Sequence, residues 1–181
     1  FWNHVKAQFL DVIEWMEDDR STLVWRFPVF NQAIQDGGRL VVREGQSACF
    51  QSEGRLSDTF GPGTHEISTR TPAIWGFFQS IKYGFNYPYK GDIFFVSTRR
   101  FYDNKWGTAG PIMMNDPQLG PIEVRAFGTY SYRITDAATF IREVVGNAGL
   151  FTTDEINRQL KRTLASAFAD TLGEAKIPVM Q

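Results

Sequence analysis

Apolar residues near the start of the chain recur at the spacing of an α-helix. Plotted at about 3.6 residues per turn, one side of residues 1–17 collects Phe1, Trp2, Val5, Phe9, Val12, Ile13 and Met16. The other side is acidic, and Lys6 is the only basic residue before Arg20. We predict an amphipathic helix here, with Phe1, Val5, Phe9, Val12 and Met16 as a face toward a membrane or a partner. Anionic headgroups repel an acidic side at about 1 kcal/mol per charge, so docking onto protein is favoured over lipid insertion.

Residues 41–67 alternate short apolar runs with turn residues, which predicts a small antiparallel meander. The turns fall at Glu44-Gly45, Glu53-Gly54 and Gly61-Pro62-Gly63. Residues 22–30 predict a further strand in which Pro28 lies at an edge or end, because proline cannot donate to a ladder. Residues 93–96 are apolar on both faces, as in a central strand.

The clearest alternation of apolar and polar residues runs from Ile122 to Ile134. One face collects Ile122, Val124, Ala126, Gly128, Tyr130, Tyr132 and Ile134, and the other collects Glu123, Arg125, Phe127, Thr129, Ser131 and Arg133. Side chains on a strand alternate between faces, so this pattern predicts a strand with one buried face.

Three later segments have the period and end signals of helices. Thr71-Pro72 opens a short aromatic helix that ends at Gly84, and Asp136 caps another that ends at Gly146. Thr152 and Glu155 form a capping box for a longer helix that stops at Gly173. Its stripe, a candidate assembly surface, consists of Ile156, Leu160, Leu164 and Phe168. These elements predict an α+β fold, with helices packed on a curved, largely antiparallel sheet.

Composition limits the classes of function. With 181 residues and 43% hydrophobic content, the chain can bury a core, and we expect an N-terminal segment over residues 1–20 and one domain over residues 21–181. Lys and Arg number 19 against 20 Asp and Glu, which gives no general attraction to nucleic acid. No window approaches the roughly 20 apolar residues that span a bilayer. The single cysteine fits a reducing compartment, so the expected location is cytoplasmic.

Catalytic chemistry has little support in the sequence. His4 and His65 are the only histidines, and no phosphate-binding loop, nucleophile elbow or helical zinc motif occurs. We therefore predict no catalytic residue, no metal and no cofactor. Cys49 and His65 are read as a buried thiol and a loop histidine. The alternative is a small-molecule or peptide-binding domain, or a weak enzyme, with an aromatic pocket near Cys49 and His65 beside the run at residues 74–89.

Several segments, taken in order, resemble the SPFH domain, also called Band 7 or prohibitin homology domain. A strand, a turn of the REGQ kind at residues 43–46, a second strand and a proline-glycine step match the opening of that domain. DVIEW, KYGFN, FVSTRRF, KWGT and RAFGTYSYRI, which begin at residues 11, 82, 95, 105 and 125, resemble its bacterial virion core protein-like branch.

The resemblance covers nearly the whole chain and implies a non-enzymatic, membrane-associated scaffold. It implies a homo-oligomer in the full-length protein and peripheral contact with the inner face of the membrane. It further implies a role in bacterial envelope maintenance or stress, with a membrane-remodelling protein as partner. Assembly in this family commonly uses helices beyond the domain.

Overall fold

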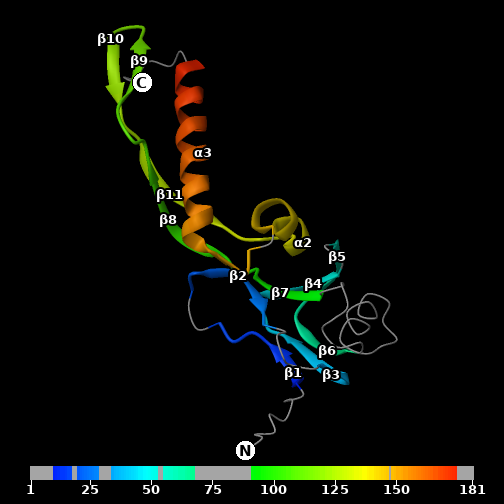
Figure 1. Ribbon diagram of the computed structural model, residues 1–181. Helices are drawn as coiled ribbons and strands as arrows, with labels where there is room; N and C mark the ends of the chain where they lie inside the picture. Colours follow the sequence, from blue (N-terminus) through cyan, green and yellow to red (C-terminus); the bar gives the residue numbers. More distant parts are fainter. Residues whose placement is uncertain are drawn as a thin grey trace, which may run out of the picture. The chain divides into compact units, whose positions relative to one another are not determined.

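The computed structural model describes residues 10–17, 20–28, 34–52, 55–67, 91–146 and 148–174. Contacts divide the chain into two units, whose elements are drawn in Figure 1. The first unit comprises Phe1–Arg99 and Ile134–Thr152, and the second comprises Arg100–Arg133 and Thr153–Gln181. The predicted helix at residues 71–84 and the turn at Glu53-Gly54 lie outside the described residues.

A five-stranded antiparallel sheet forms the centre of the first unit. Its order is β12 (Leu150–Thr152), β2 (Thr22–Phe27), β7 (Gly91–Ser97), β4 (Gln46–Ser52) and β5 (Arg55–Phe60). The central position of β7 confirms the prediction from its apolar run, because Ile93, Phe94, Phe95 and Val96 are all buried. Strand β2 ends at Phe27, so Pro28 stands at its end as predicted.

A three-stranded sheet lies against this one. Its order is β1 (Leu10–Glu14), β3 (Ile34–Val42) and β6 (Gly63–Ile67), with β1 parallel to β3 and β6 antiparallel to it. One apolar cluster takes side chains from both sheets, including Ile13, Leu40, Phe50 and Phe95. The core of the first unit is therefore the space between two sheets.

The predicted N-terminal helix is wrong where the structure describes it. Leu10–Glu14 forms strand β1, and exposure in this region alternates with a period of two. Ile13 and Trp15 are buried, whereas Val12 is 41% exposed and Met16 is 60% exposed. Pairing with β3 places Ile13 and Trp15 in the apolar cluster, which a helical stripe would not have grouped together.

The predicted meander is confirmed as strands but is shared between the two sheets. The turn between β3 and β4 contains Gly45 at φ +79°, a backbone conformation that favours glycine. Strand β6 pairs with β3 instead of β5. The chain thus leaves the five-stranded sheet at the Gly61-Pro62-Gly63 step and returns to the other sheet.

A short helical layer completes the first unit. Helix α2 (Ala137–Phe140) continues as a π-helical segment, η1 (Ile141–Val145). Asp136 caps it as predicted, since its Oδ1 accepts a hydrogen bond of 3.0 Å from the Thr139 N–H. The segment ends at Gly146 at φ +59°. Helix α2 contacts β4 and β5, so the five-stranded sheet is covered there by helix.

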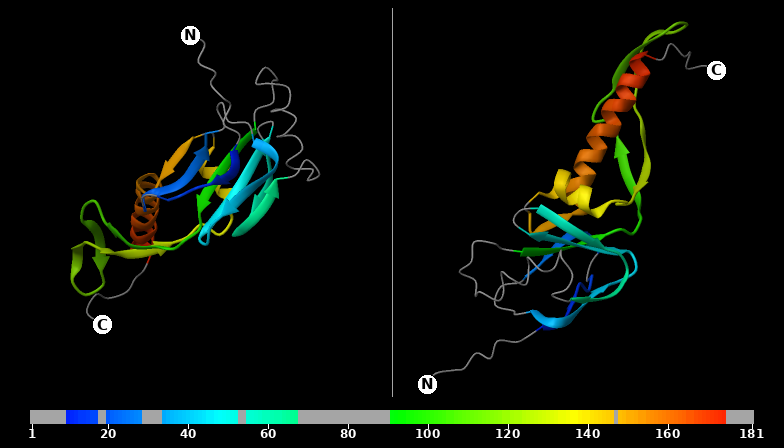
Figure 2. Two further views of the ribbon diagram at one scale, coloured as in Figure 1. Left: turned by 90° about the horizontal axis from the view of Figure 1, so that it is seen from below. Right: turned by 90° about the vertical axis from the view of Figure 1, so that its right-hand side faces the viewer.

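The second unit is a long hairpin with one helix beside it. Strands β8 (Phe101–Gly107) and β11 (Phe127–Tyr132) pair, and so do β9 (Ile112–Asp116) and β10 (Gly120–Val124). We call these four strands and their connections the arm. Helix α3 (Thr153–Glu174) lies along the arm in Figure 1 and in the right view of Figure 2. With mostly antiparallel strands and these helices, the chain has the predicted α+β class.

Candidate assembly surface

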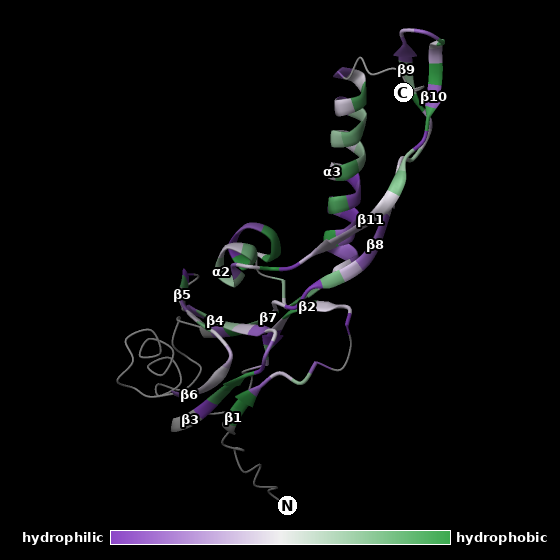
Figure 3. Cartoon of the chain, turned by 180° about the vertical axis from the view of Figure 1, so that it is seen from behind, coloured by the Kyte–Doolittle hydropathy of each residue, from purple (hydrophilic) through white to green (hydrophobic). Residues whose placement is uncertain are grey.

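Helix α3 contacts the arm, and the residues of its apolar stripe remain partly exposed. Helix α3 contacts β8 and β9, and Ile156, Leu160, Leu164 and Phe168 are each half-buried. None of the residues from Thr153 to Glu174 is buried. Apolar positions recur along this helix in Figure 3. The stripe predicted from the sequence therefore exists, and it retains apolar surface that a neighbour could cover.

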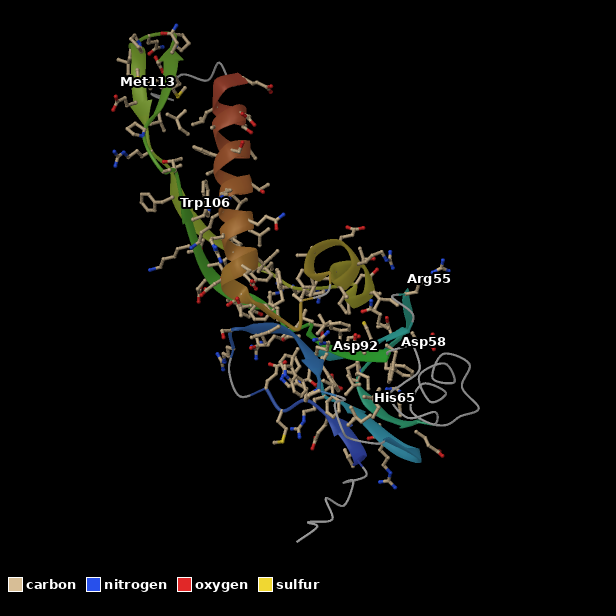
Figure 4. The ribbon with its side chains drawn as sticks, in the orientation of Figure 1. Arg55, Asp58, His65, Asp92, Trp106 and Met113 are labelled. Atoms are coloured by element: carbon tan, nitrogen blue, oxygen red, sulfur yellow. The ribbon has the colours of Figure 1, made fainter. Side chains whose placement is uncertain are left out.

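An aromatic contact fixes the middle of the helix on the arm. The rings of Trp106 and Phe168 lie 5.7 Å apart at 63°, an edge-to-face arrangement. Gly128, on the adjacent strand, makes room for it, because a Cβ there would stand 3.0 Å from the Trp106 Nε1. Figure 4 labels Trp106 on the arm beside α3 and Met113 toward the end of the hairpin.

Two tyrosines of β11 differ in the hydrogen bonding of their hydroxyl groups. The Tyr130 hydroxyl donates a 2.8 Å hydrogen bond to the Asn157 Oδ1 of α3. The Tyr132 hydroxyl is buried and has no partner among the described residues, while its ring stacks on Phe101. Burial raises the pKa of Tyr132 to about 12, with smaller contributions from Tyr130 and Asp154. This hydroxyl therefore stays protonated at any physiological pH.

The two units differ sharply in how much apolar surface they bury. Among the described residues of the second unit, Phe101 is the one buried hydrophobic residue, whereas the first unit holds the whole remaining set. The helix and the arm therefore bury few apolar side chains between them.

The N-terminal face is described in part. Phe1, Val5 and Phe9 lie outside the described residues, while Val12 and Met16 are exposed on and just after β1. Within the described ranges, none of the helices combines the length and apolar content needed to cross a bilayer.

Cys49 and His65 have separate partners. Cys49 is buried, and its Sγ lies 3.6 Å from the Thr59 Oγ1. The His65 Nε2 is 2.9 Å from the Gly61 carbonyl oxygen, and its ring packs edge-on against Phe60. Neither contact links the two side chains, so the catalytic pair that the sequence left open gains no support here. The aromatic run at residues 74–89 lies outside the described residues.

A polar pocket that the sequence reading missed lies at the turn between β3 and β4. Its volume is about 240 Å³, and it is lined by Glu17, Arg43, Glu44, Gly45, Gln46 and Arg99. Arg99 pairs with Glu17 at 2.6 Å, and the buried Gln46 amide donates to the Trp15 carbonyl oxygen at 3.2 Å. These contacts hold the segment after β1 against the turn. The REGQ sequence at residues 43–46 predicted the turn, but no sequence pattern indicated that Glu17 would lie against it.

Comparisons with known proteins agree with this fold. One relative is the protein named "Uncharacterized protein YdjI" from Bacillus subtilis (strain 168), which is 28% identical over 159 residues. That match covers 86% of this chain and 48% of the relative, so the chain spans about half the relative's length. No solved structure matches the chain. The model of the SPFH domain-Band 7 family matches residues 24–181, which include the described helices and strands except β1 and the first residues of β2. The chain therefore belongs to the SPFH domain-Band 7 family.

Proposed function

We propose that this chain is a non-enzymatic assembly domain of a membrane-associated scaffold, and that α3 with the arm is where copies meet. The SPFH domain-Band 7 family is in general one of membrane-associated scaffolds that commonly form oligomers. The proposal includes peripheral contact with the inner face of a bacterial membrane. It also includes the role in envelope maintenance and the membrane-remodelling partner that the resemblance implies. Vesicle flotation tests the membrane contact.

The half-covered stripe of α3 carries the proposal. Full burial of a Leu, Ile or Phe side chain is worth about 1.5–3 kcal/mol. Because Ile156, Leu160, Leu164 and Phe168 are half-buried, a second copy that covered them would gain part of that free energy at each position. A stable association needs many such gains to offset the lost freedom of two molecules. A helix of 22 residues provides a surface long enough for this.

Paired aspartate substitutions test the proposal. Ile156→Asp with Leu160→Asp places two charges in the stripe and should give a folded chain whose assemblies have a lower mass than those of the wild type, as measured by light scattering across a concentration series. The matched control is Gln159→Asp with Thr163→Asp, which adds the same charge to exposed positions of the same helix. Circular dichroism checks the fold of both variants.

Two outcomes would overturn the proposal. A wild-type chain that stays monomeric at every concentration has no assembly surface. Loss of the native fold in the Ile156 and Leu160 variant, with the control intact, would make the stripe a cover for the arm within one chain.

A further inference from the structure

The arm has a second face, turned away from α3, with an aromatic side chain in open solvent. Exposure alternates residue by residue along most of the arm, and Phe127 is 88% exposed, the largest value among the large hydrophobic residues that the structure describes. Met113 on the same face is 63% exposed. We call this surface the outer face. It includes Lys105, Gly107, Met113, Glu123, Arg125 and Phe127.

An intrachain explanation for Phe127 does not fit its exposure. Phe127 lies opposite Gly107 across the β8–β11 ladder, and an aromatic ring can stabilise a sheet by lying over a cross-strand glycine. A ring folded onto Gly107 would lose much of its accessible surface. With 88% of its surface exposed, the Phe127 ring stands clear of the arm, and the nearest atoms to a Cβ built at Gly107 would be the Ala126 carbonyl oxygen at 3.3 Å and the Phe127 Cβ at 3.5 Å.

We propose that the outer face binds the outer face of a second copy of this chain, about a two-fold axis that runs along the arm. This inference rests on the proposed scaffold function and names a second surface for it. Such an axis sets β11 of one copy over β8 of the other. Each outer-face residue of one copy then faces, in the other copy, the residue that is its own cross-strand neighbour in the arm. Phe127 of each copy therefore enters the space above Gly107 of the other.

The register of the arm makes this pairing compatible at two further positions. Glu123 lies opposite Met113, and Thr129 lies opposite Lys105. In the pair of copies, Glu123 faces a methionine and Lys105 faces a threonine, so like charges do not face each other. Packed sheet faces stand about 10 Å apart, a distance that long side chains fill.

Opposite charges two residues apart give the pair its direction. Glu123 and Arg125 are both exposed on the outer face. The two-fold axis along the arm places Arg125 of each copy diagonally across from Glu123 of the other, so two reciprocal ion pairs form. An axis across the arm through Phe127 would instead bring Arg125 toward Lys105 of the other copy, a like-charge contact that disfavours that arrangement.

This surface differs from the α3 stripe and has a different consequence. One self-complementary surface closes at a dimer. The α3 stripe and the outer face lie on opposite sides of the arm, so using both extends the assembly beyond a dimer. Loss of either surface would leave the other able to form dimers.

Phe127→Ser and a charge exchange test the inference in the full chain. Sedimentation over a concentration series should show a dissociation constant raised about tenfold or more by Phe127→Ser, as expected for an aromatic anchor. Leu150→Ser, at another exposed large hydrophobic residue, is the control and should leave it unchanged. Glu123→Arg and Arg125→Glu should each weaken association, and the two together should restore it.

The outcomes separate this inference from the α3 proposal. If Phe127→Ser and the charge variants keep the wild-type mass while the Ile156 and Leu160 variant loses it, the outer face is not an interface and the α3 proposal stands. If Phe127→Ser keeps the mass but reduces flotation with vesicles, the residue contacts lipid and the inference is overturned. A double charge variant that stays as weak as the single ones contradicts the two-fold axis.

Discussion

Cys49 shows how its neighbours decide the chemistry of one side chain. The residue is fully buried on β4, between β5 and β7. Burial raises the pKa of the Cys49 thiol, the Thr59 hydrogen bond partly opposes this, and the charge of Asp136 adds to the rise. The thiolate is the reactive form, so a raised pKa and a buried sulfur both suppress reaction in the folded state.

Thiol labelling should therefore report unfolding. In the native chain at about pH 8, near the usual thiol pKa, we expect slow reaction of Cys49 with a maleimide, and rapid complete reaction in denaturant. Thr163→Cys in a Cys49→Ala background, at an exposed position of α3, should react at once under native conditions. Fast native labelling of Cys49 would revive the reactive-thiol alternative.

Strand β1 shows why an element can be misassigned from a pattern. A short apolar run fits a helical stripe and a strand almost equally well. In the structure Ile13 and Trp15 are both buried, and their spacing of two residues is that of a strand. The predicted helical stripe included Ile13 and left out Trp15. Parallel pairing with β3 is a contact between segments distant in sequence, which local periodicity cannot reveal.

Two N-terminal deletions should differ strongly in their effect on stability. Removal of residues 1–9 leaves Ile13 and Trp15 in the core, so the chain should keep a cooperative unfolding transition. Removal of residues 1–19 takes both away, and each large core side chain contributes about 2–5 kcal/mol, enough to unfold a marginally stable domain. Chemical denaturation measures the difference. A chain without residues 1–19 that unfolds at the wild-type denaturant concentration would contradict the role of β1.

The shorter deletion also makes vesicle flotation interpretable. Phe1, Val5 and Phe9 are removed while the core remains, so lost flotation would reflect a lost membrane contact and not a lost fold. Neutral and anionic vesicles at two salt concentrations distinguish apolar from electrostatic attraction. Unchanged flotation would move the membrane contact away from residues 1–9.

In the arm, the predicted alternation of exposure was correct although the predicted strand boundaries were wrong. The alternation at residues 122–134 predicted one strand, whereas β10 ends at Val124 and β11 begins at Phe127. The alternation of exposure continues through the break, where the Thr108 N–H donates to the Ala126 carbonyl oxygen at 2.9 Å. The prediction of Phe127 on the polar face was therefore correct. The turn before β10 was missed, although Asp116, Pro117 and Gly120 are typical turn residues.

At the scale of the whole molecule, features that depend on residues within one element were predicted better from the sequence than pairings between distant strands. The apolar run of β7 and the stripe of α3 were visible because each depends on residues within one element. The pairing of β6 with β3 was not, since it joins segments across two intervening strands. The division into two units with unequal cores also depends on such pairings.

Unequal cores imply unequal stability in the two units. The first unit buries side chains between two sheets, and its backbone hydrogen bonds should open mainly in global unfolding. The second unit has Phe101 as the one buried hydrophobic among its described residues, so it has less apolar burial to oppose local opening. Association would supply the burial that the unit lacks.

Hydrogen exchange over a concentration series tests this coupling. In dilute samples, amides of α3 and the arm should exchange faster than those of β4 and β7, with opening free energies lower by a few kcal/mol. Protection of the second unit should rise with protein concentration, because association stabilises the bound form by mass action, while that of the first unit stays constant. The Ile156→Asp and Leu160→Asp variant should lose the part of this dependence due to α3. Equal protection of both units in the most dilute sample would show that α3 and the arm are stable without a partner, and would remove the physical reason for assembly there.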